Sequence, residues 1–510
     1  MTVLPELTDF RAGYEAGRPQ LVWRILVADL ETPVSAFMKL CHGRRHAFLM
    51  ESVEGGAVRG RYSFIGFNPD VIWRCRGEQA WINDTPDAAP DAFRPCPVAE
   101  KMGTLASLRD LIDRSRIDMP AFLPPMAAGL VGYMAYDMIR LVERLPDANP
   151  DEIGVPDGIF MRPTIMAMFD NINGTLTAVT PVRPVAGTDA NTAYAEAGRR
   201  IDRVIEALDR SLPHGGETVQ RSQHQPTPVP GMSPEAYGAM VAKAKEYIAA
   251  GDIFQVVLSQ RMTVPFALQP FSLYRSLRRM NPSPFLFYLD FGDFQLVGSS
   301  PEILVRLRDG KVTIRPIAGT RRRGIDAAED EALAADLLAD PKELAEHLML
   351  LDLGRNDVGR VSDIGSVKVT RRMAVEYYSH VMHIVSNVEG RLRAGLDSMD
   401  ALMAGFPAGT VSGAPKIRAM EIIDELEPVR RSFYAGCIGY FAGNGNMDTC
   451  IALRTALVKD GTMYIQAGAG IVADSVAEKE HEECQNKARV LVRVAEDAIN
   501  YTNLSNERPK

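Results

Sequence analysis

Hydrophobic and polar positions follow different periods in different parts of the chain. From residue 18 to about residue 185, short β-branched and aromatic runs are broken by turn residues, as in 46–56, which predicts a strand-rich region. Ile201, Val204 and Leu208 then recur at helical spacing. An amphipathic helix is therefore predicted to close this first region.

A polar stretch rich in Pro, Gly and Gln follows and predicts an exposed linker. Directly after it, Ser233 predicts a helix start and Gly251 its end, and a strand pattern follows over 254–264. The pattern predicts an N-terminal region, a linker and a second region, residues 1–212, 213–232 and 233–510.

The second region mixes strand-like runs with helical patterns. The predicted strands lie at 285–291, 295–297, 312–314, 435–441, 449–457 and 463–467. Two predicted helices begin near Asp340 and Ser475. Because strands and helices do not alternate regularly, the pattern favours an α+β architecture over a doubly wound sheet.

Composition narrows the class of protein. A length of 510 residues allows about three domains or fewer large ones. The net charge of -8 argues against a general nucleic-acid binder, because no basic surplus exists to neutralise phosphates. The six cysteines form no CxxC pair, which disfavours a zinc site or a disulfide framework. With no signal-peptide pattern and no long apolar run, we expect a soluble cytoplasmic protein that binds no membrane.

The first candidate for chemistry is the helix predicted near residue 340. Asp340 is a suitable N-cap and Pro341 suits the first turn. Glu343 and Glu346, three residues apart, share one helical face. The opposite, apolar side is predicted to contain Leu344, Leu348 and Leu351.

A second helix near the end of the chain repeats this acidic pattern. Ser475 and Glu478 predict a capping box, and Glu480, Glu483 and Lys487 follow at spacings of three and four. Two facing acidic helices would form an oxygen-rich site that Mg²⁺ accepts, completed by waters and an anionic substrate. Ordinary solvated helices also carry such pairs, so spacing alone leaves both interpretations open.

Two glycine-containing stretches are further candidates. Gly319 and Thr320 are predicted at a turn before three arginines, with a solvated hairpin end as the alternative. Gly468 and Gly470 follow an apolar strand, where missing side chains let backbone amides approach an anion. A carboxylate-binding turn is predicted there, because the third glycine of a dinucleotide fingerprint is absent.

Two charged or titratable residues stand in apolar runs. Arg454 is predicted inside a strand, where a buried guanidinium needs either an internal acid or a ligand carboxylate as its partner. His383 in a similar run fits either a hydrogen-bonded core residue or a general base.

Several long motifs together closely resemble the chorismate-utilising enzymes, in particular anthranilate synthase component I. They lie at 316–324, 342–362, 406–428, 451–458 and 465–488, and the likeness spans 233–500. The resemblance implies two packed antiparallel sheets flanked by helices, with the N-terminal region docked on them. It also implies a lyase that converts chorismate and ammonia to anthranilate and pyruvate, the first step of tryptophan biosynthesis.

The resemblance assigns roles to individual residues. Glu346 and Glu483 match the Mg²⁺ ligands of the family, and Glu343 and Glu480 match positions of water-mediated carboxylates. The positions that match the chorismate-binding pocket are Gly319, Thr320, Tyr434, Arg454, Gly468, Ala469, Gly470 and Lys487.

The catalytic positions follow in the same way. Glu302 matches the acid that protonates the departing 4-hydroxyl, His383 the histidine of the elimination step, and Thr320 belongs to the same catalytic set. Ala318 and Gln255 stand where other branches of the family carry lysines, which favours external ammonia as the nucleophile.

Regulation and partners are also implied. Stretches 48–55 and 281–291 resemble motifs of tryptophan-sensitive enzymes, although a strand edge and a turn without a ligand are the alternative. The predicted inhibitor pocket for L-tryptophan contains Glu51, Ser52, Pro284, Phe285 and Leu286. No glutaminase signature is present, so ammonia is expected from a separate glutamine amidotransferase subunit, anthranilate synthase component II, or from free ammonium. An oligomer is expected.

Two other functions remain open at the level of sequence. One is aminodeoxychorismate synthase component I, which would leave an amino product without loss of pyruvate. The other is a non-catalytic amino-acid sensor that keeps the same fold.

Overall fold

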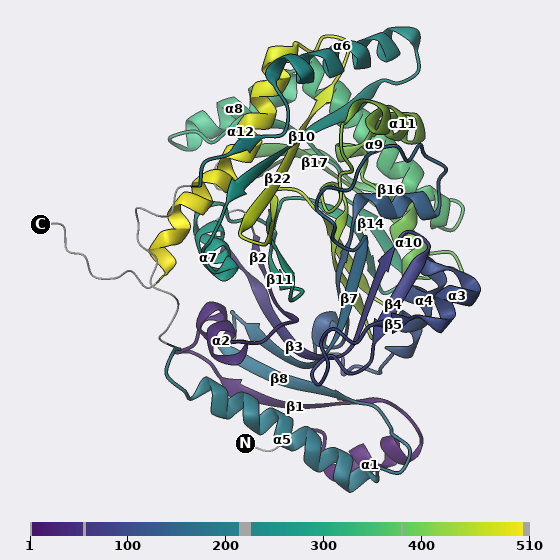
Figure 1. The fold of residues 1–510 in the computed structure, drawn as a ribbon, viewed down its shortest axis with the longest axis vertical. Helices are drawn as coiled ribbons and strands as arrows, with labels where there is room; N and C mark the ends of the chain where they lie inside the picture. Colours follow the sequence, from purple (N-terminus) through teal and green to yellow (C-terminus); the bar gives the residue numbers. More distant parts are fainter. Residues whose placement is uncertain (1–2, 55–57, 214–225, 379–380, 503–510) are drawn as a thin grey trace, which may run out of the picture.

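The computed structural model describes residues 3–54, 58–213, 226–378 and 381–502, in which helices cover an extensive antiparallel sheet (Figure 1). The strands before residue 213 are β1 (Gln20–Val27), β2 (Ala47–Glu54), β3 (Val58–Arg76), β4 (Gln79–Asn83), β5 (Arg94–Pro95), β6 (Gly129–Met134), β7 (Gly158–Asp170) and β8 (Thr175–Val182). The α-helices there are α1 (Leu7–Glu15), α2 (Pro33–Leu40), α3 (Pro97–Met102), α4 (Thr104–Arg114) and α5 (Ala190–Leu208). The predicted closing helix is thus confirmed as α5, and α2, α3 and α4 interrupt the strand-rich region.

The remaining strands are β9 (Val229–Pro230), β10 (Gln255–Pro265), β11 (Phe285–Asp290), β12 (Phe294–Ser300), β13 (Ile303–Arg308), β14 (Lys311–Ile314), β15 (Ile317–Arg322), β16 (Lys368–Tyr377), β17 (Val381–Arg391), β18 (Gly413–Ala414), β19 (Cys437–Ala442), β20 (Met447–Ile451), β21 (Thr455–Lys459) and β22 (Thr462–Ile471). The helices are α6 (Pro234–Ala250), α7 (Pro270–Met280), α8 (Ala327–Ala339), α9 (Pro341–Val361), α10 (Ser398–Gly405), α11 (Lys416–Leu426) and α12 (Ala477–Asp497). Short 3₁₀ turns include Pro125–Ala127, Tyr136–Leu141, Gly409–Val411 and Ala498–Tyr501.

Strand pairing joins the two parts of the chain. The long ladders β3 with β7 and β10 with β22 are antiparallel. β11 pairs with β2, and β19 pairs with β6, so strands from before and after the predicted linker belong to one hydrogen-bonded network. The prediction of an α+β fold built on antiparallel sheet is confirmed.

Helix ends test the sequence signals directly. Ser233 caps α6 and Gly251 ends it with a left-handed φ of 85°, and Asp340 caps α9, as predicted. The predicted capping box of α12 is wrong: Val476 is the N-cap, and the Ser475 hydroxyl accepts a hydrogen bond from the Val472 amide instead.

The apolar side of α9 also differs in part from the prediction. Leu351 is buried, but Leu348 is 42% exposed and His347 is fully buried. The Nε2 atom of His347 lies 2.6 Å from the Ser386 hydroxyl of β17, which gives this polar ring a partner in the core.

Most of the predicted linker, residues 214–225, lies outside the described residues. Its last residues include β9, which pairs with β10. The division at 212 and 233 stays a prediction. Among the described residues, no helix is long and apolar enough to cross a membrane.

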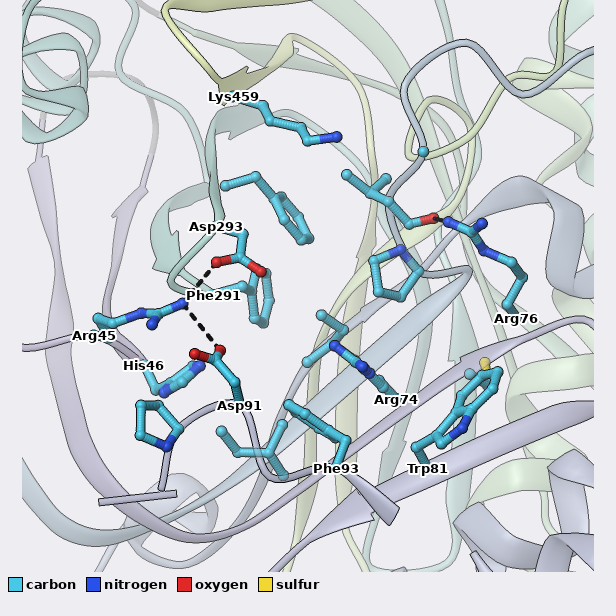
Figure 2. Close-up of a pocket in the computed structure, with 18 residues that line it drawn as sticks. Arg45, His46, Arg74, Arg76, Trp81, Asp91, Phe93, Phe291, Asp293 and Lys459 are labelled. Atoms are coloured by element: carbon cyan, nitrogen blue, oxygen red, sulfur yellow. Dashed lines mark hydrogen bonds and ion pairs between the residues drawn. The ribbon is translucent and has the colours of Figure 1, made fainter. Parts of the chain in front are cut away.

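Two cavities adjoin the strands that link the two parts of the chain. The larger, of about 950 Å³, is lined by residues of β2, β11 and β16, among others. The smaller, of about 370 Å³, lies between β3, β4 and the β11–β12 turn (Figure 2).

Candidate active site

The pairing of β15 with β17 brings two predicted site segments together. Ala318 pairs with Ile384 and Thr320 with His383, and the register shifts between them at Gly319. Gly319 has φ of 69°, which favours glycine, and a Cβ there would lie 3.1 Å from the Glu343 carboxylate. The predicted turn is therefore a bulge within a strand, because the ladder with β17 continues on both sides.

His383 is held in one orientation by this bulge. Its Nδ1 atom lies 3.0 Å from the Gly319 carbonyl oxygen and 3.1 Å from the Thr320 hydroxyl. Because a carbonyl only accepts, Nδ1 carries the hydrogen and Nε2 keeps its lone pair. Burial lowers the pKa of His383 to about 4, so the ring is neutral at neutral pH. A neutral imidazole with a free Nε2 lone pair is suited to accept a proton.

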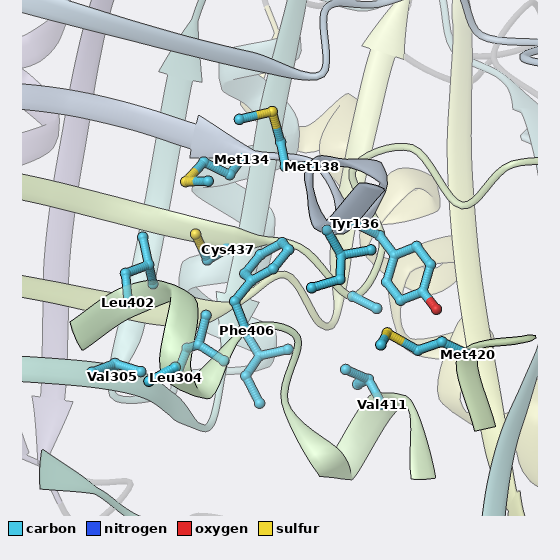
Figure 3. Packing of buried hydrophobic residues seen from close by; sticks show 14 of the residues in the cluster. Met134, Tyr136, Met138, Leu304, Val305, Leu402, Phe406, Val411, Met420 and Cys437 are labelled. Carbon is cyan, nitrogen blue, oxygen red and sulfur yellow. The ribbon is translucent and has the colours of Figure 1, made fainter. Parts of the chain in front are cut away.

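Glu302 is a buried carboxyl group with one hydroxyl donor. The Thr410 hydroxyl donates to its Oε1 at 2.9 Å. Burial raises the pKa of Glu302 to about 8, against the smaller opposing effects of Thr410, the Ile317 amide and Arg454. Leu304 and Val411, close to Glu302 and Thr410 in sequence, belong to a packed apolar cluster (Figure 3). Glu302 therefore holds a proton at neutral pH and is suited to donate it.

Arg454 departs from its predicted place inside a strand. It lies at a bend between β20 and β21 with φ of 47°, and its carbonyl accepts a hydrogen bond from the Ser299 amide at 3.1 Å. Burial lowers the pKa of Arg454, while Glu302 and Tyr378 raise it. Among the described residues, no carboxylate lies within 4.0 Å of its guanidinium. Such a group is available to bind a ligand carboxylate.

The glycines at 468 and 470 also lie within a strand. Both belong to β22, so the predicted turn is wrong, while carboxylate binding there stays a prediction; Gly468 pairs with Ser259 and Gly470 with Val257. A Cβ on Gly468 would come 2.9 Å from the Tyr434 hydroxyl. Glycine at this position therefore makes room for a neighbouring polar group.

Three other predicted pocket residues lie around this strand. Ala469 and Tyr434 are buried, and burial raises the pKa of Tyr434, so its hydroxyl stays protonated. Lys487 donates to the Gly468 carbonyl at 2.9 Å. These contacts connect β22 to the acidic face of α12.

The four predicted metal-site carboxylates form two pairs. Gln255 donates to Glu346 at 3.2 Å, and Lys487 lies 2.7 Å from Glu483. In the part of the chain that the structure describes, no group of three or more His, Cys, Asp or Glu side chains is placed to hold a metal ion. The protein alone therefore does not assemble a cage of four carboxylates.

The electrostatics of these pairs nevertheless fit a divalent cation. Burial raises the pKa of Glu343 and the charge of Glu346 raises it further. Burial likewise raises the pKa of Glu480, and Glu483 adds to this effect. Mg²⁺ needs only one or two carboxylates when waters and substrate complete its shell, and it would relieve this like-charge repulsion.

All five residues of the predicted inhibitor pocket line the 950 Å³ cavity. Glu51 is already bound there by Arg278, at 2.5 Å, and by the Tyr274 hydroxyl, at 2.6 Å. Glu376 and Tyr378 line the same cavity, and the Tyr378 ring lies edge-on to His383 at 5.4 Å between centroids. The cavity thus extends from the β2–β11 pair towards the candidate active site.

Two residues of the site were not predicted. Thr410 lies within the motif 406–428, so that motif was a usable signal for it. Tyr378 reaches His383 only through the pairing of β16 with β17, and the sequence around it carries no comparable signal.

Comparison with known proteins agrees with this geometry. The chorismate binding enzyme family matches residues 65–493. Anthranilate synthase component 1 of Cereibacter sphaeroides is 56% identical over 492 residues, which cover 96% of this chain and 97% of that protein. The Pseudomonas aeruginosa protein of the same name is 49% identical, over 92% of this chain and 93% of its own length.

A solved structure agrees as well. That of anthranilate synthase component I from Streptococcus pneumoniae has a TM-score of 0.74 and 38% identity, and it covers 92% of this chain and 99% of its own. The chain therefore belongs to the chorismate binding enzymes, and within them to the anthranilate synthase component 1 group.

Proposed function

We propose that this chain is the chorismate-converting subunit of anthranilate synthase, which forms anthranilate and pyruvate from chorismate and ammonia. The proposal rests on the buried carboxyl of Glu302, held by the Thr410 hydroxyl, and on the guanidinium of Arg454, which has no carboxylate within 4.0 Å among the described residues; burial raises the pKa of Glu302. An acid beside a carboxylate receptor is the arrangement required to expel a hydroxyl group from an anionic substrate.

Each residue of the candidate active site has its own role in the proposed reaction. Arg454, together with the Tyr434 hydroxyl, binds the enolpyruvyl carboxylate. Ammonia adds to C2 of the ring while Glu302 gives its proton to the 4-hydroxyl, which leaves as water. His383 then accepts the C2 proton through Nε2, pyruvate departs with a proton, and the ring becomes aromatic. Ala318 leaves no side-chain amine at that position to compete with ammonia.

Mg²⁺ is part of the proposal, with Glu346 and Glu483 as its protein ligands. When bound, it would supply positive charge that holds and polarises the ring carboxylate. Support comes from the mutual repulsion within each carboxylate pair and from the donors Gln255 and Lys487 that now contact the two ligands.

Regulation and ammonia supply complete the proposal. L-Tryptophan would bind in the 950 Å³ cavity near Glu51 and Ser52 and inhibit the enzyme. Ammonia would come from glutamine through a component II amidotransferase, in line with the "component 1" name of the relatives. We also propose an oligomer in the cytoplasm.

The decisive experiment measures anthranilate fluorescence from purified chain with chorismate, ammonium and Mg²⁺. Glu483→Gln should abolish most turnover, whereas Glu482→Gln, on the neighbouring exposed position, should not. Added tryptophan should lower the rate of the unmodified chain. Equal activity of the two variants would remove Glu483 from the site.

Product analysis separates the alternatives. A non-aromatic amino compound, formed without pyruvate, would identify an aminodeoxychorismate synthase instead. Tryptophan binding without any chorismate consumption would identify a non-catalytic sensor.

A further inference from the structure

The 370 Å³ cavity is separate from the candidate active site. Its walls come from both parts of the chain: Arg74 of β3, Trp81 of β4, Phe93 before β5 and Lys459 of β21 (Figure 2). None of the residues assigned to chorismate, Mg²⁺ or tryptophan lines it. Its volume falls within the range of small-molecule sites.

The charges in this cavity are unbalanced towards the positive. Both acids at its rim lie by Arg45, with Asp293 at 2.7 Å and Asp91 at 3.6 Å. Arg74 forms no ion pair within 4.0 Å among the described residues, and Lys459 donates only to the Ile153 carbonyl, at 2.8 Å. The whole chain carries a net charge of -8, so a cavity with an excess of positive side chains differs from the rest of the molecule and indicates a site for an anion.

Arg74 is held in a fixed orientation. Its guanidinium carbon lies 3.7 Å from the centroid of the Phe93 ring, which is cation–π stacking. Burial lowers the pKa of Arg74, while Asp293 and Asp91 raise it. A guanidinium stacked on one face keeps its in-plane N–H groups free, and these bind a carboxylate with two parallel hydrogen bonds.

The rest of the cavity is apolar and aromatic. Phe291 lies on one side and Trp81 on another (Figure 2), and Phe294, Val155 and Pro156 also line the cavity. Flat rings gain burial and edge or offset contacts against such walls. The cavity therefore suits a ligand with one anionic group and one planar apolar body.

The larger cavity offers an instructive contrast. It also contains arginines, but Arg306 and Arg308 both contact Asp448. Arg315 and Arg371 both contact Glu376 in the same way. Each arginine that lines the larger cavity therefore has a carboxylate within 4.0 Å, whereas Arg74 in the smaller cavity has none among the described residues.

We propose that the 370 Å³ cavity is a second binding site, for a small aromatic carboxylate whose carboxylate lies on Arg74 and whose ring lies against Trp81 and the neighbouring phenylalanines. Lys459 adds positive charge to the same cavity, while Arg76, which also lines it, lies 3.9 Å from Asp151. The site joins strands from before and after the predicted linker, so its ligand would contact both parts of the chain.

The test uses 4-nitrobenzoate, a quencher of tryptophan fluorescence, with the full chain. Of the three tryptophans, Trp23 and Trp73 are buried and only Trp81 lines the cavity. We expect saturable quenching that Trp81→Phe largely removes and that Arg74→Gln weakens by about tenfold or more. Neutral 4-nitrobenzamide should bind weaker by a similar factor, because it lacks the carboxylate.

Matched variants keep the proposal falsifiable. Arg372→Gln, at an exposed position, and Arg454→Gln, in the candidate active site, should leave the quenching midpoint unchanged. If Arg74→Gln does not fold, Arg74→Lys should still weaken binding, because lysine lacks the planar pair of donors. An unchanged midpoint in folded Arg74 variants, a loss of quenching only in Arg454→Gln, or no saturable quenching would each overturn the proposal.

Discussion

At the scale of single residues, burial determines the proposed acid chemistry of Glu302. Its pKa of about 8 means that the carboxyl is protonated at pH 7 and loses its proton as the pH rises through 8. We predict that the rate of anthranilate formation falls above that pH. Glu302→Gln should lower kcat by about 10²- to 10⁴-fold. pH–rate profiles of the unmodified chain and of Glu302→Gln test both the loss of rate at high pH and the lower kcat. They are measured with saturating chorismate and ammonium and corrected for the fraction of free ammonia.

Thr410 provides the control for this prediction. Its hydroxyl stabilises the ionised form of Glu302, so Thr410→Val should raise the pKa of the acid and move the alkaline limb to higher pH. A limb that stays in place would mean that another group is the acid.

Gly319 carries a second prediction at this scale. Its left-handed φ strains any other residue, and an added Cβ would lie only 3.1 Å from Glu343 and 3.2 Å from Ile384. We predict that Gly319→Ala destabilises the protein by about 1–3 kcal/mol and displaces the carbonyl that orients His383, so that kcat falls as well. Urea unfolding and steady-state kinetics measure the two effects.

The chain contains a matched glycine. Gly359 lies within α9 with no neighbour within 4 Å of an added Cβ. Gly359→Ala should therefore stabilise the protein by about 0.5–1 kcal/mol without affecting turnover. Similar losses of stability in both variants would contradict the strain assigned to Gly319.

At the scale of elements, the start of α9 positions one acidic pair. The Asp340 carboxylate accepts from the Lys342 amide at 3.0 Å and from Arg321 at 2.9 Å. We predict that Asp340→Ala costs about 0.5–2 kcal/mol, because the first turn loses its cap. Asp340→Asn keeps the cap and loses only a partly exposed ion pair, so it should cost less than about 1 kcal/mol.

Thermal and urea unfolding of both variants measure the loss of stability, and Mg²⁺ titrations of activity measure the Mg²⁺ requirement. Asp340→Ala should also need more Mg²⁺, because Glu343 and Glu346 lie in the first two turns of the same helix. If both variants lose equal stability, the ion pair and not the cap holds the helix end.

At the scale of the whole molecule, buried histidines make the fold sensitive to acid. Burial lowers the pKa of His46, His347 and His383 to about 4 in each case. The unfolded chain, with a histidine pKa of about 6.5, binds more protons between those values. The contribution of these histidines to stability is therefore fully present above about pH 6.5 and is lost as the pH falls towards 4, whereas the raised pKa values of Glu302 and Asp290 act in the opposite sense.

Urea midpoints between pH 7 and pH 5 check this expectation. His347→Gln replaces a histidine that has no assigned role in the reaction. This variant should weaken the dependence of the urea midpoint on pH, while the glutamine side chain still offers Ser386 a hydrogen-bond partner. Because Glu302 and Asp290 affect the unmodified chain and the variant alike, the same pH dependence in both would contradict the burial of an uncharged His347.

Local signals explain why much of the fold was predictable. Ser233, Gly251 and Asp340 act on their own helix ends, so their effects are readable without the rest of the chain. Ser475 has the same type of signal, but its hydroxyl accepts a hydrogen bond from the Val472 amide, in the turn directly after β22. A competing local hydrogen bond, between residues three positions apart, thus replaced the predicted capping pattern.

The sequence by itself determined the α+β class, the helices α5, α6, α9 and α12, part of the strands, and the family to which the chain belongs, because periodicity, caps and long motifs are properties of consecutive residues. Only the tertiary structure decided that Gly319, Gly468 and Gly470 lie in strands and that Arg454 lies at a bend without an acid partner. Only the tertiary structure also decided that the pKa of Glu302 is raised and that Arg74 has no carboxylate partner among the described residues. Desolvation and unpaired charge depend on residues distant in sequence, and these meet only once the chain has folded.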